Sequence, residues 1–126
     1  FSKFLSQEAN YHHMTFNEAE MVKLSQNTTL ASRVAISNVI YDFCEGIGVD
    51  YSRIRKVAFD SFPILGPSMV LVPGPDGKRG FGGKCLPKDT YAFNTFLPNK
   101  ILDEILKYNQ TLRDDLNQVL ENYGKD

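Results

Sequence analysis

The feature that most constrains this fold is a long helical pattern in the first half of the chain. Thr15-Phe16-Asn17-Glu18 has the S/T-x-x-E form of a capping box, which marks the N-terminus of a helix. No proline interrupts the pattern that follows, and Gly46 and Gly48 are suited to end it. The sequence therefore predicts a helix of about 29 residues, or roughly 43 Å at 1.5 Å per residue.

The second half of this helix is apolar on almost all sides. A few polar residues interrupt the run from 30 to 44 without sharing one face: Ser32, Arg33, Ser37, Asn38 and Asp42. A helix that is apolar all round must be covered all round. A chain of 126 residues has few elements for that task. We therefore expect this helix to pack against a second copy of itself or against domains outside this sequence.

Shorter helices are predicted after the long one. Asp50 can cap a helix that runs to about Phe59. Residues 61–84 contain closely spaced prolines and glycines and are typical of a long loop, in which residues 70–72 can form a brief extended segment. The fold class expected from these patterns is all-α, with a long central helix plus shorter helices.

Two more helices complete the predicted set. Pro87 suits the first turn of a helix that ends near Phe96, before Pro98. Asn99 can cap a last helix that continues to about Tyr123 and carries an apolar stripe typical of core packing.

Composition argues against several classes of partner. The net charge is −1, so no basic field attracts nucleic acid or an anionic membrane surface. No apolar run is long enough to cross a bilayer, and the first residues lack the features of a signal peptide. We expect a cytoplasmic protein with no nucleic-acid partner and no membrane. Because residue 1 is not Met, we also expect a piece of a longer chain.

The two cysteines differ in their surroundings. Cys44 lies in the helical apolar pattern, where a cysteine behaves as a small hydrophobe. Cys85 lies in the polar stretch GFGGKCLPKD, residues 80–89. A disulfide between the two is compatible with the sequence, but two cysteines are not a disulfide scaffold. We interpret both as reduced thiols.

Cys85 has the neighbours that a reactive thiol needs. It lies just before a predicted helix start and between Lys84 and Lys88, so the helix dipole and two cations can favour the thiolate. The glycines at positions 80, 82 and 83 keep side chains away and leave backbone N–H groups free for a ligand. Taken locally, this stretch fits a functional thiol and a packed structural cysteine equally well.

Other chemical signals are weaker. Lys23 and Asn27 are four residues apart and share a helix face, where they can hold an oxyanion and a water, although a solvated face has the same appearance and is locally favoured. His12-His13 is interpreted as a surface or cap pair. Nothing in the sequence places a histidine beside Cys85 or gives metal-ligand spacing, and Gly-Phe-Gly-Gly is not a dinucleotide fingerprint.

Three stretches together resemble the UDP-glucose/GDP-mannose dehydrogenase family. GFGGKCLPKD is similar to that family's catalytic-cysteine motif. Residues 18–50 resemble its central helix, with the E-x-x-K-x-x-x-N pattern at Glu20, Lys23 and Asn27. YNQTLRDDL, residues 108–116, is similar to a segment of the central domain's last helix. The resemblance extends from about residue 17 to 116.

The resemblance implies an activity and a set of site residues. Members of the family oxidise the C6 alcohol of a nucleotide sugar to the acid with two NAD⁺. By resemblance, Cys85 attacks the C6 aldehyde, Lys23 stabilises the oxyanion, Asn27 positions it together with a water, and Asp89 supports that water. The remaining assignments implied are substrate binding by Lys23, Asn27, Gly80, Phe81 and Gly82, cofactor binding by Cys85 and Lys88, and no metal.

The resemblance also implies a domain organisation and partners. Residues 1–16 would be the remnant of a linker from a missing N-terminal NAD-binding lobe, and residues 17–123 the central helical dimerisation and catalytic-cysteine domain. With the flanking Rossmann lobes absent, NAD would be bound mainly outside this chain, and the isolated fragment is expected to be inactive. UDP-glucose is the expected substrate, and a homodimer through the long helix is the expected assembly.

The chain departs from the family pattern in one region. The family's sugar-binding arginine is missing after Asp60, and the loop before the cysteine is longer by the insertion VPGPDGKRG. Lys78 and Arg79 are candidates to replace the missing charge. The alternative to an enzyme is a non-catalytic helical dimerisation module that keeps the family scaffold.

Overall fold

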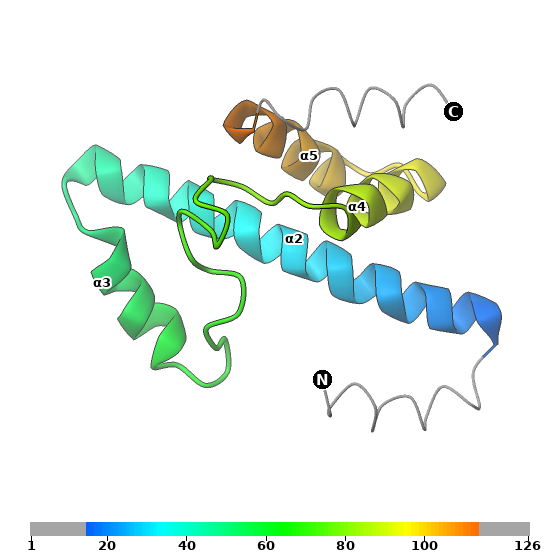
Figure 1. Cartoon of the computed structure of the whole chain (residues 1–126), viewed down its shortest axis with the longest axis horizontal. Helices are drawn as coiled ribbons and strands as arrows, with labels where there is room; N and C mark the ends of the chain where they lie inside the picture. Colours follow the sequence, from blue (N-terminus) through cyan, green and yellow to red (C-terminus); the bar gives the residue numbers. More distant parts are fainter. Residues whose placement is uncertain (1–14, 114–126) are drawn as a thin grey trace.

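The computed structural model describes residues 15–113, and every regular element in that range is helical (Figure 1). The elements are α2 (Phe16–Ile47), α3 (Tyr51–Arg55), the π-helical turn η1 (Lys56–Asp60), α4 (Cys85–Phe96) and α5 (Lys100–Leu112). The predicted all-α class, with one long helix and several shorter ones, is confirmed. Residues 1–14 of the expected linker, which was placed at residues 1–16, and the His12-His13 pair lie outside the described residues.

Both ends of α2 are capped by the residues that the sequence indicated. The Thr15 hydroxyl accepts the Glu18 N–H at 3.1 Å, and the Glu18 carboxylate accepts the Thr15 N–H at 2.9 Å. These hydrogen bonds, the one from the Thr15 backbone above all, lower the pKa of Glu18. Gly48 ends the helix in the left-handed conformation, with φ of 76°. The 32 residues of α2 span about 48 Å.

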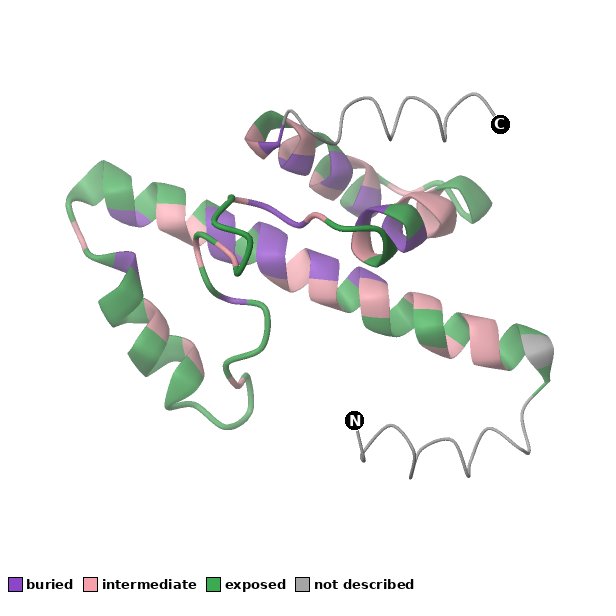
Figure 2. Cartoon of the chain, in the orientation of Figure 1, coloured by how far each residue is buried: buried purple, intermediate pink, exposed green. Residues whose placement is uncertain are grey.

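One side of α2 carries the core. Helices α4 and α5 pack against each other and against α2. The buried cluster consists of Ala31, Val34, Phe81 and Leu106, and partly buried Leu86, Tyr91 and Ile105 pack around it. Figure 2 shows the buried positions of α2 along its middle, next to the loop and the two shorter helices. The core is therefore small and lies where the Gly-rich segment meets α2 and α5.

Helix α3 and η1 turn back from the C-terminal end of α2 (Figure 1). Asp50 accepts the Ser52 N–H at 3.1 Å, as expected for its capping role. Tyr51 is buried, meets the ring of Tyr41 edge-on at 5.8 Å, and donates its hydroxyl to the Val70 carbonyl at 2.6 Å. One tyrosine thus connects α2, α3 and the following loop.

Residues 61–84 contain no regular element, and they are nevertheless anchored. Arg33 of α2 donates to the carbonyls of Leu65 and Gly66 at 2.6 and 2.8 Å. Together with the Tyr51 bond to Val70, these contacts hold the first half of the loop against α2 and α3. Residues 70–72, for which a brief extended segment was predicted, form no regular strand, and the Val70 carbonyl accepts the Tyr51 hydroxyl.

Two predicted helix boundaries also need correction. Helix α4 begins at Cys85 itself, so the cysteine occupies the first turn and does not precede it. Helix α5 ends at Leu112, because Arg113 has an extended backbone with φ of −141° and ψ of 104°. The predicted continuation to Tyr123 otherwise lies outside the described residues.

The core predicts a contrast between two aliphatic residues of α5. Leu106 is 6% exposed and Ile101 is 74% exposed. Leu106→Ala leaves a cavity, so we expect the free energy of unfolding to fall by about 2–5 kcal/mol. Ile101→Ala should change it by less than about 0.5 kcal/mol. Native-state hydrogen exchange of the α5 amides measures both, and equal effects would contradict this description of the core.

Candidate active site

A hydrogen bond between α2 and α4 joins two of the predicted catalytic residues. The Asn27 amide donates to the Asp89 carboxylate at 2.6 Å, across 62 positions of sequence. Asp89 is only 4% exposed, whereas Asn27 is half-buried. Lys23 is exposed and lies one turn before Asn27 on α2. The structure therefore brings Asn27 and Asp89 together and leaves Lys23 beside them on the open side.

Cys85 is the first residue of α4 and is exposed. Asp89 lies four residues later, which places both on one face of α4. Exposed Lys84 precedes the thiol and exposed Lys88 follows one turn later. The exposed thiol therefore begins α4 and has exposed lysines on both sides of it in the sequence. Cys44 is buried, and the two cysteines are not bonded to each other.

The Gly-rich segment before Cys85 is fixed by a buried asparagine of α5. Asn109 accepts the Phe81 N–H at 2.8 Å and donates to the Phe81 carbonyl at 2.9 Å. Gly80 has φ of 79°, and a Cβ added there would overlap the Asn109 side-chain oxygen. Phe81 itself is 2% exposed and inserts its ring into the core.

Arg113 fills the space beside the next glycine. A Cβ at Gly82 would overlap its guanidinium, which forms an ion pair with Asp76 at 2.8 Å. The Lys78 backbone N–H, and then Arg113, lower the pKa of Asp76. The interpretation of these glycines as open ligand contacts therefore needs correction. Gly80 makes room for Asn109 of α5 and Gly82 for Arg113 just after α5, whereas Gly83 faces open space.

A hollow of about 330 Å³ lies next to this segment. Gly80, Phe81 and Gly82, the three predicted substrate contacts in the loop, all line it. Its other walls are mainly apolar side chains of the loop and of α2 and α4: Val34, Pro67, Met69, Leu71, Pro75 and Leu86. Lys23 and Asn27 are not among its lining residues, so the predicted substrate contacts fall into two groups.

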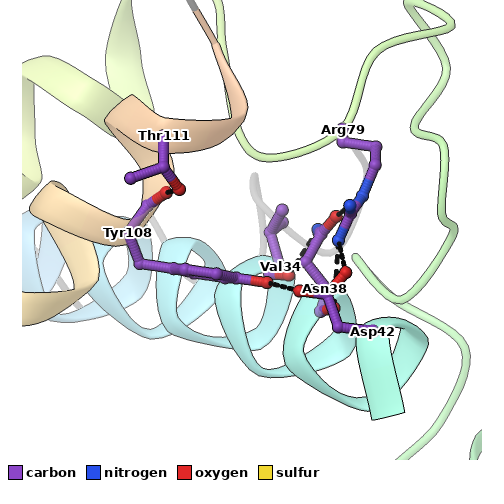
Figure 3. A network of polar contacts seen from close by, with 6 residues as sticks. All are labelled: Val34, Asn38, Asp42, Arg79, Tyr108 and Thr111. Carbon is purple, nitrogen blue, oxygen red and sulfur yellow. Dashed lines mark hydrogen bonds and ion pairs between the residues drawn. The ribbon is translucent and has the colours of Figure 1, made fainter. Parts of the chain in front are cut away.

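Arg79 is directed at α2 and not at this hollow (Figure 3). Its guanidinium donates to the Asn38 side chain at 3.0 Å, to the Asn38 carbonyl at 3.1 Å and to Asp42 at 2.7 Å. Its centre also lies 4.7 Å from the centroid of the Tyr41 ring. Arg79 is therefore occupied by protein groups, which disfavours the suggestion that it replaces the missing sugar-binding arginine.

Sequence reasoning missed Asn109 and Arg113 as residues that hold the site. Asn109 is buried on α5 at the helical spacing of Leu102 and Leu106, and Arg113 is buried at the residue that follows the end of this helix. A polar residue on an apolar stripe was the available signal, because a buried amide or guanidinium must have partners. The partners themselves could not be read from the sequence, since Phe81 is 28 positions away.

Two further structural features are absent from the described residues. Between residues 15 and 113, no helix has both the length and the hydropathy that a membrane crossing requires. In the same part of the chain, no three His, Cys, Asp or Glu side chains gather as metal ligands would.

Comparison with known proteins now identifies the class. Residues 17–114 match the UDP-glucose/GDP-mannose dehydrogenase family, central domain. The chain belongs to this family. UDP-glucose 6-dehydrogenase of Rickettsia bellii is 35% identical over 98 residues, which is 73% of this chain and 21% of that protein. UDP-glucose 6-dehydrogenase TuaD of Bacillus subtilis is 32% identical over 101 residues, or 75% of this chain and 20% of that protein.

The similarity has a limited extent. The chain spans about a fifth of the length of the curated relatives that it matches, 21% in the Rickettsia bellii protein. UDP-glucose 6-dehydrogenase of Rickettsia felis matches over 87% of this chain and 24% of its own length, at 32% identity. No solved structure matches this chain.

Two glycines with the same backbone conformation test the role of Asn109. Gly77 and Gly80 have φ of 77° and 79°, but only Gly80 faces a side chain. Alanine at either position costs about 1–2 kcal/mol of backbone strain. Gly80→Ala should lose about 1–3 kcal/mol more through overlap with Asn109. Thermal unfolding of the two variants measures the difference, and equal losses would disprove the contact.

Proposed function

We propose that this chain is the central domain of a nucleotide-sugar 6-dehydrogenase of the UDP-glucose to UDP-glucuronate type, with Cys85 as its nucleophile. The observation that carries the proposal is the Asn27–Asp89 hydrogen bond of 2.6 Å, one helical turn from the exposed thiol. A reactive thiol, a buried carboxylate and an amide on two crossing helices are the groups that thioester chemistry needs. Family membership supports the same assignment.

In this mechanism Cys85 forms and releases a covalent bond. Its thiolate adds to the C6 aldehyde of the sugar, and the S–C bond converts the carbonyl into a hemithioacetal oxyanion. Loss of hydride from C6 leaves a thioester, and water then cleaves the C–S bond to give the carboxylate and restore the thiol. A thiolate serves both steps because it is a good nucleophile and a good leaving group. Cys85 is exposed in the first turn of α4, so its thiol is accessible to the sugar.

Lys23 is proposed to stabilise the oxyanion. Lys23 is exposed on α2, one helical turn before Asn27. A cation fixed where negative charge develops lowers the barrier of both the addition and the hydrolysis. Lys23 would therefore act in the same two steps as Cys85.

Asn27 and Asp89 are proposed to hold the hydrolytic water. The Asn27 amide donates to one Asp89 oxygen, which leaves the carboxylate oriented and able to accept a hydrogen bond from water. A water held there can lose a proton toward Asp89 as it attacks the thioester. The burial of Asp89 keeps this carboxylate in one position.

The hollow lined by Gly80, Phe81 and Gly82 is the proposed site for part of the nucleotide sugar. Its walls are mainly apolar, and Asp76 is a charged residue among them. UDP-glucose is the proposed substrate, because relatives that match most of this chain are UDP-glucose 6-dehydrogenases.

NAD⁺ is the proposed oxidant, and when bound it accepts a hydride in each of two oxidations. Cys85 and Lys88 are both exposed and lie three residues apart on α4. The reactive ring of NAD⁺ can therefore approach the thiol while a phosphate of NAD⁺ approaches the lysine. No dinucleotide fingerprint occurs in the sequence. We therefore propose that residues outside this chain provide most of the dinucleotide site.

Substitution of Cys85 in the full-length protein tests the mechanism. Cys85→Ala should reduce formation of UDP-glucuronate by about 10³-fold or more, because the covalent route is lost. Cys44→Ala is the matched control and should retain activity. Saturating UDP-glucose should also protect Cys85 of the wild-type protein against iodoacetamide. Full activity of Cys85→Ala, or no oxidation of UDP-glucose by the wild type, would favour a non-catalytic dimerisation module.

We propose in addition that two copies pair through α2. Apolar side chains at helical spacing on α2 are more than half exposed: Ile36 by 56%, Val39 by 53%, Phe43 by 70% and Ile47 by 61%. Such a stripe marks an interaction surface. A two-fold axis brings the stripe of one copy against the same stripe of a second copy. No other protein is then needed to cover it.

A charge on this stripe should separate the copies. Phe43→Glu places a carboxylate in the proposed interface, and we expect a monomer by light scattering at micromolar concentration, where the wild type is a dimer. Phe96→Glu is the control, because Phe96 is 91% exposed on α4. A wild-type monomer, or an intact dimer of Phe43→Glu, would contradict pairing through α2.

A further inference from the structure

Arg79 lies in the second half of the long loop, and its guanidinium has several partners. Arg79 uses Nε for the Asn38 side chain at 3.0 Å and Nη2 for both the Asn38 carbonyl at 3.1 Å and Asp42 at 2.7 Å. Asn38 is 1% exposed, and its own amide donates to the Val34 carbonyl at 2.9 Å. The guanidinium therefore binds a part of α2 that is itself fixed.

The same network reaches α5. The Tyr108 hydroxyl donates to the second Asp42 oxygen at 2.6 Å, so Asp42 lies between Arg79 and Tyr108 (Figure 3). Partial burial, followed by the bond to Asp42, raises the pKa of Tyr108 to about 12. The hydroxyl is therefore a donor at neutral pH. Asp42 accepts from both sides and connects the loop with α5.

Within residues 79–81, the loop is bound by two different helices. The Arg79 side chain binds α2, whereas the Phe81 backbone binds Asn109 of α5. Gly80 lies between them with φ of 79° and no room for a Cβ. The segment then passes through Gly82 and Gly83 to Cys85, the first residue of α4. A shift at Arg79 would therefore be transmitted to the segment that presents the thiol.

We propose that Arg79, which the loop insertion supplies, is a positioning residue that fixes the Gly-rich segment and thereby the placement of Cys85 for its reaction. The inference rests on the proposed role of Cys85. Arg79 acts through the backbone of residues 80–84 and does not touch the substrate. Its function is to hold an irregular segment in one conformation, because that segment has no regular backbone ladder of its own.

The geometry requires arginine and not merely a positive charge. Two separate nitrogens of one planar guanidinium, Nε and Nη2, face the side chain and the carbonyl of Asn38. The same plane lies near the Tyr41 ring. A lysine ammonium is a single point of charge and reproduces neither the fork nor the stacking. Arg79→Lys therefore separates the effect of charge from that of geometry.

The test uses the full-length protein and three variants. Arg79→Ala removes the clamp, Arg79→Lys retains its charge, and Arg55→Ala removes an unrelated ion pair with Asp60 of 3.1 Å. Hydrogen exchange of the Phe81 amide reports on the segment without reference to activity. We expect about 10-fold faster exchange in Arg79→Ala, intermediate exchange in Arg79→Lys and no change in Arg55→Ala.

Steady-state oxidation of UDP-glucose is the second readout. Misplacement of a nucleophile lowers kcat, so Arg79→Ala should lose about 10-fold in kcat, with KM changed by no more than about twofold. Arg79→Lys should recover less than half of that loss. Unchanged Phe81 exchange in Arg79→Ala, kcat within about twofold of wild type, or full rescue by lysine would each overturn the proposal.

The two readouts separate this inference from the proposed function. If the wild type does not oxidise UDP-glucose, the proposed function fails and the positioning role in that reaction fails with it. If the wild type is active and Arg79→Ala is not impaired, only the positioning role fails. Should Arg79→Ala fold poorly, Arg79→Lys and Tyr108→Phe, which removes only the hydroxyl on Asp42, give milder versions of the same comparison.

Discussion

The buried side chain of Asn109 provides both hydrogen bonds that the backbone of Phe81 needs, at 2.8 and 2.9 Å. A buried N–H or carbonyl without a partner costs about 1–3 kcal/mol, so a loop can cross a core only where such partners exist. Because Asn109 supplies them, the ring of Phe81 can enter the core beside Val34 and Leu106. The close approach in turn requires glycine at position 80. The relative placement of α5, the core and the Gly-rich segment therefore depends on the side-chain amide of Asn109.

Helix α2 contributes to both the chemistry and the support of this domain. The candidate reactive groups are on α2 and α4, where Asn27 bonds to Asp89 and Cys85 begins a helix. The loop before Cys85 is anchored by side chains of neighbouring elements, among them Arg33, Tyr51 and Asn109. A long loop adds little entropic cost once its ends and middle are attached. A long loop before the cysteine is therefore compatible with a fixed site.

Local sequence rules predicted the helices well, because the relevant signals are local. The capping box at Thr15, the left-handed Gly48 and the caps at Asp50 and Asn99 all occur as expected. The long-range contacts of the loop could not be derived in this way. Asn109 lies 28 positions from Phe81, and Arg79 lies 41 positions from Asn38. Either arginine or asparagine can occupy a solvated surface, and only the packed structure distinguishes the two cases.

The glycines show most clearly where local reasoning fails. Three glycines beside a cysteine suggested a backbone left open for a ligand, yet Gly80 and Gly82 make room for Asn109 and Arg113. A missing side chain has the same sequence signature in both situations, since glycine permits close approach by a ligand or by the protein itself. Buried polar residues at positions 109 and 113 resolve the ambiguity, because each must find a partner: Asn109 binds the Phe81 backbone and Arg113 pairs with Asp76.

The length of α2 determines how the proposed interface and the candidate active site are related. The exposed apolar stripe from Ile36 to Ile47 and the pair Lys23 and Asn27 belong to one continuous helix of 32 residues. A helix with an intact hydrogen-bond ladder bends little over this distance, so its two halves keep a fixed relation. Asn38 and Asp42, which receive Arg79, lie within the same part of the helix as the stripe. A partner that binds the exposed stripe therefore contacts the same helix that anchors the loop. That helix also carries one side of the candidate active site.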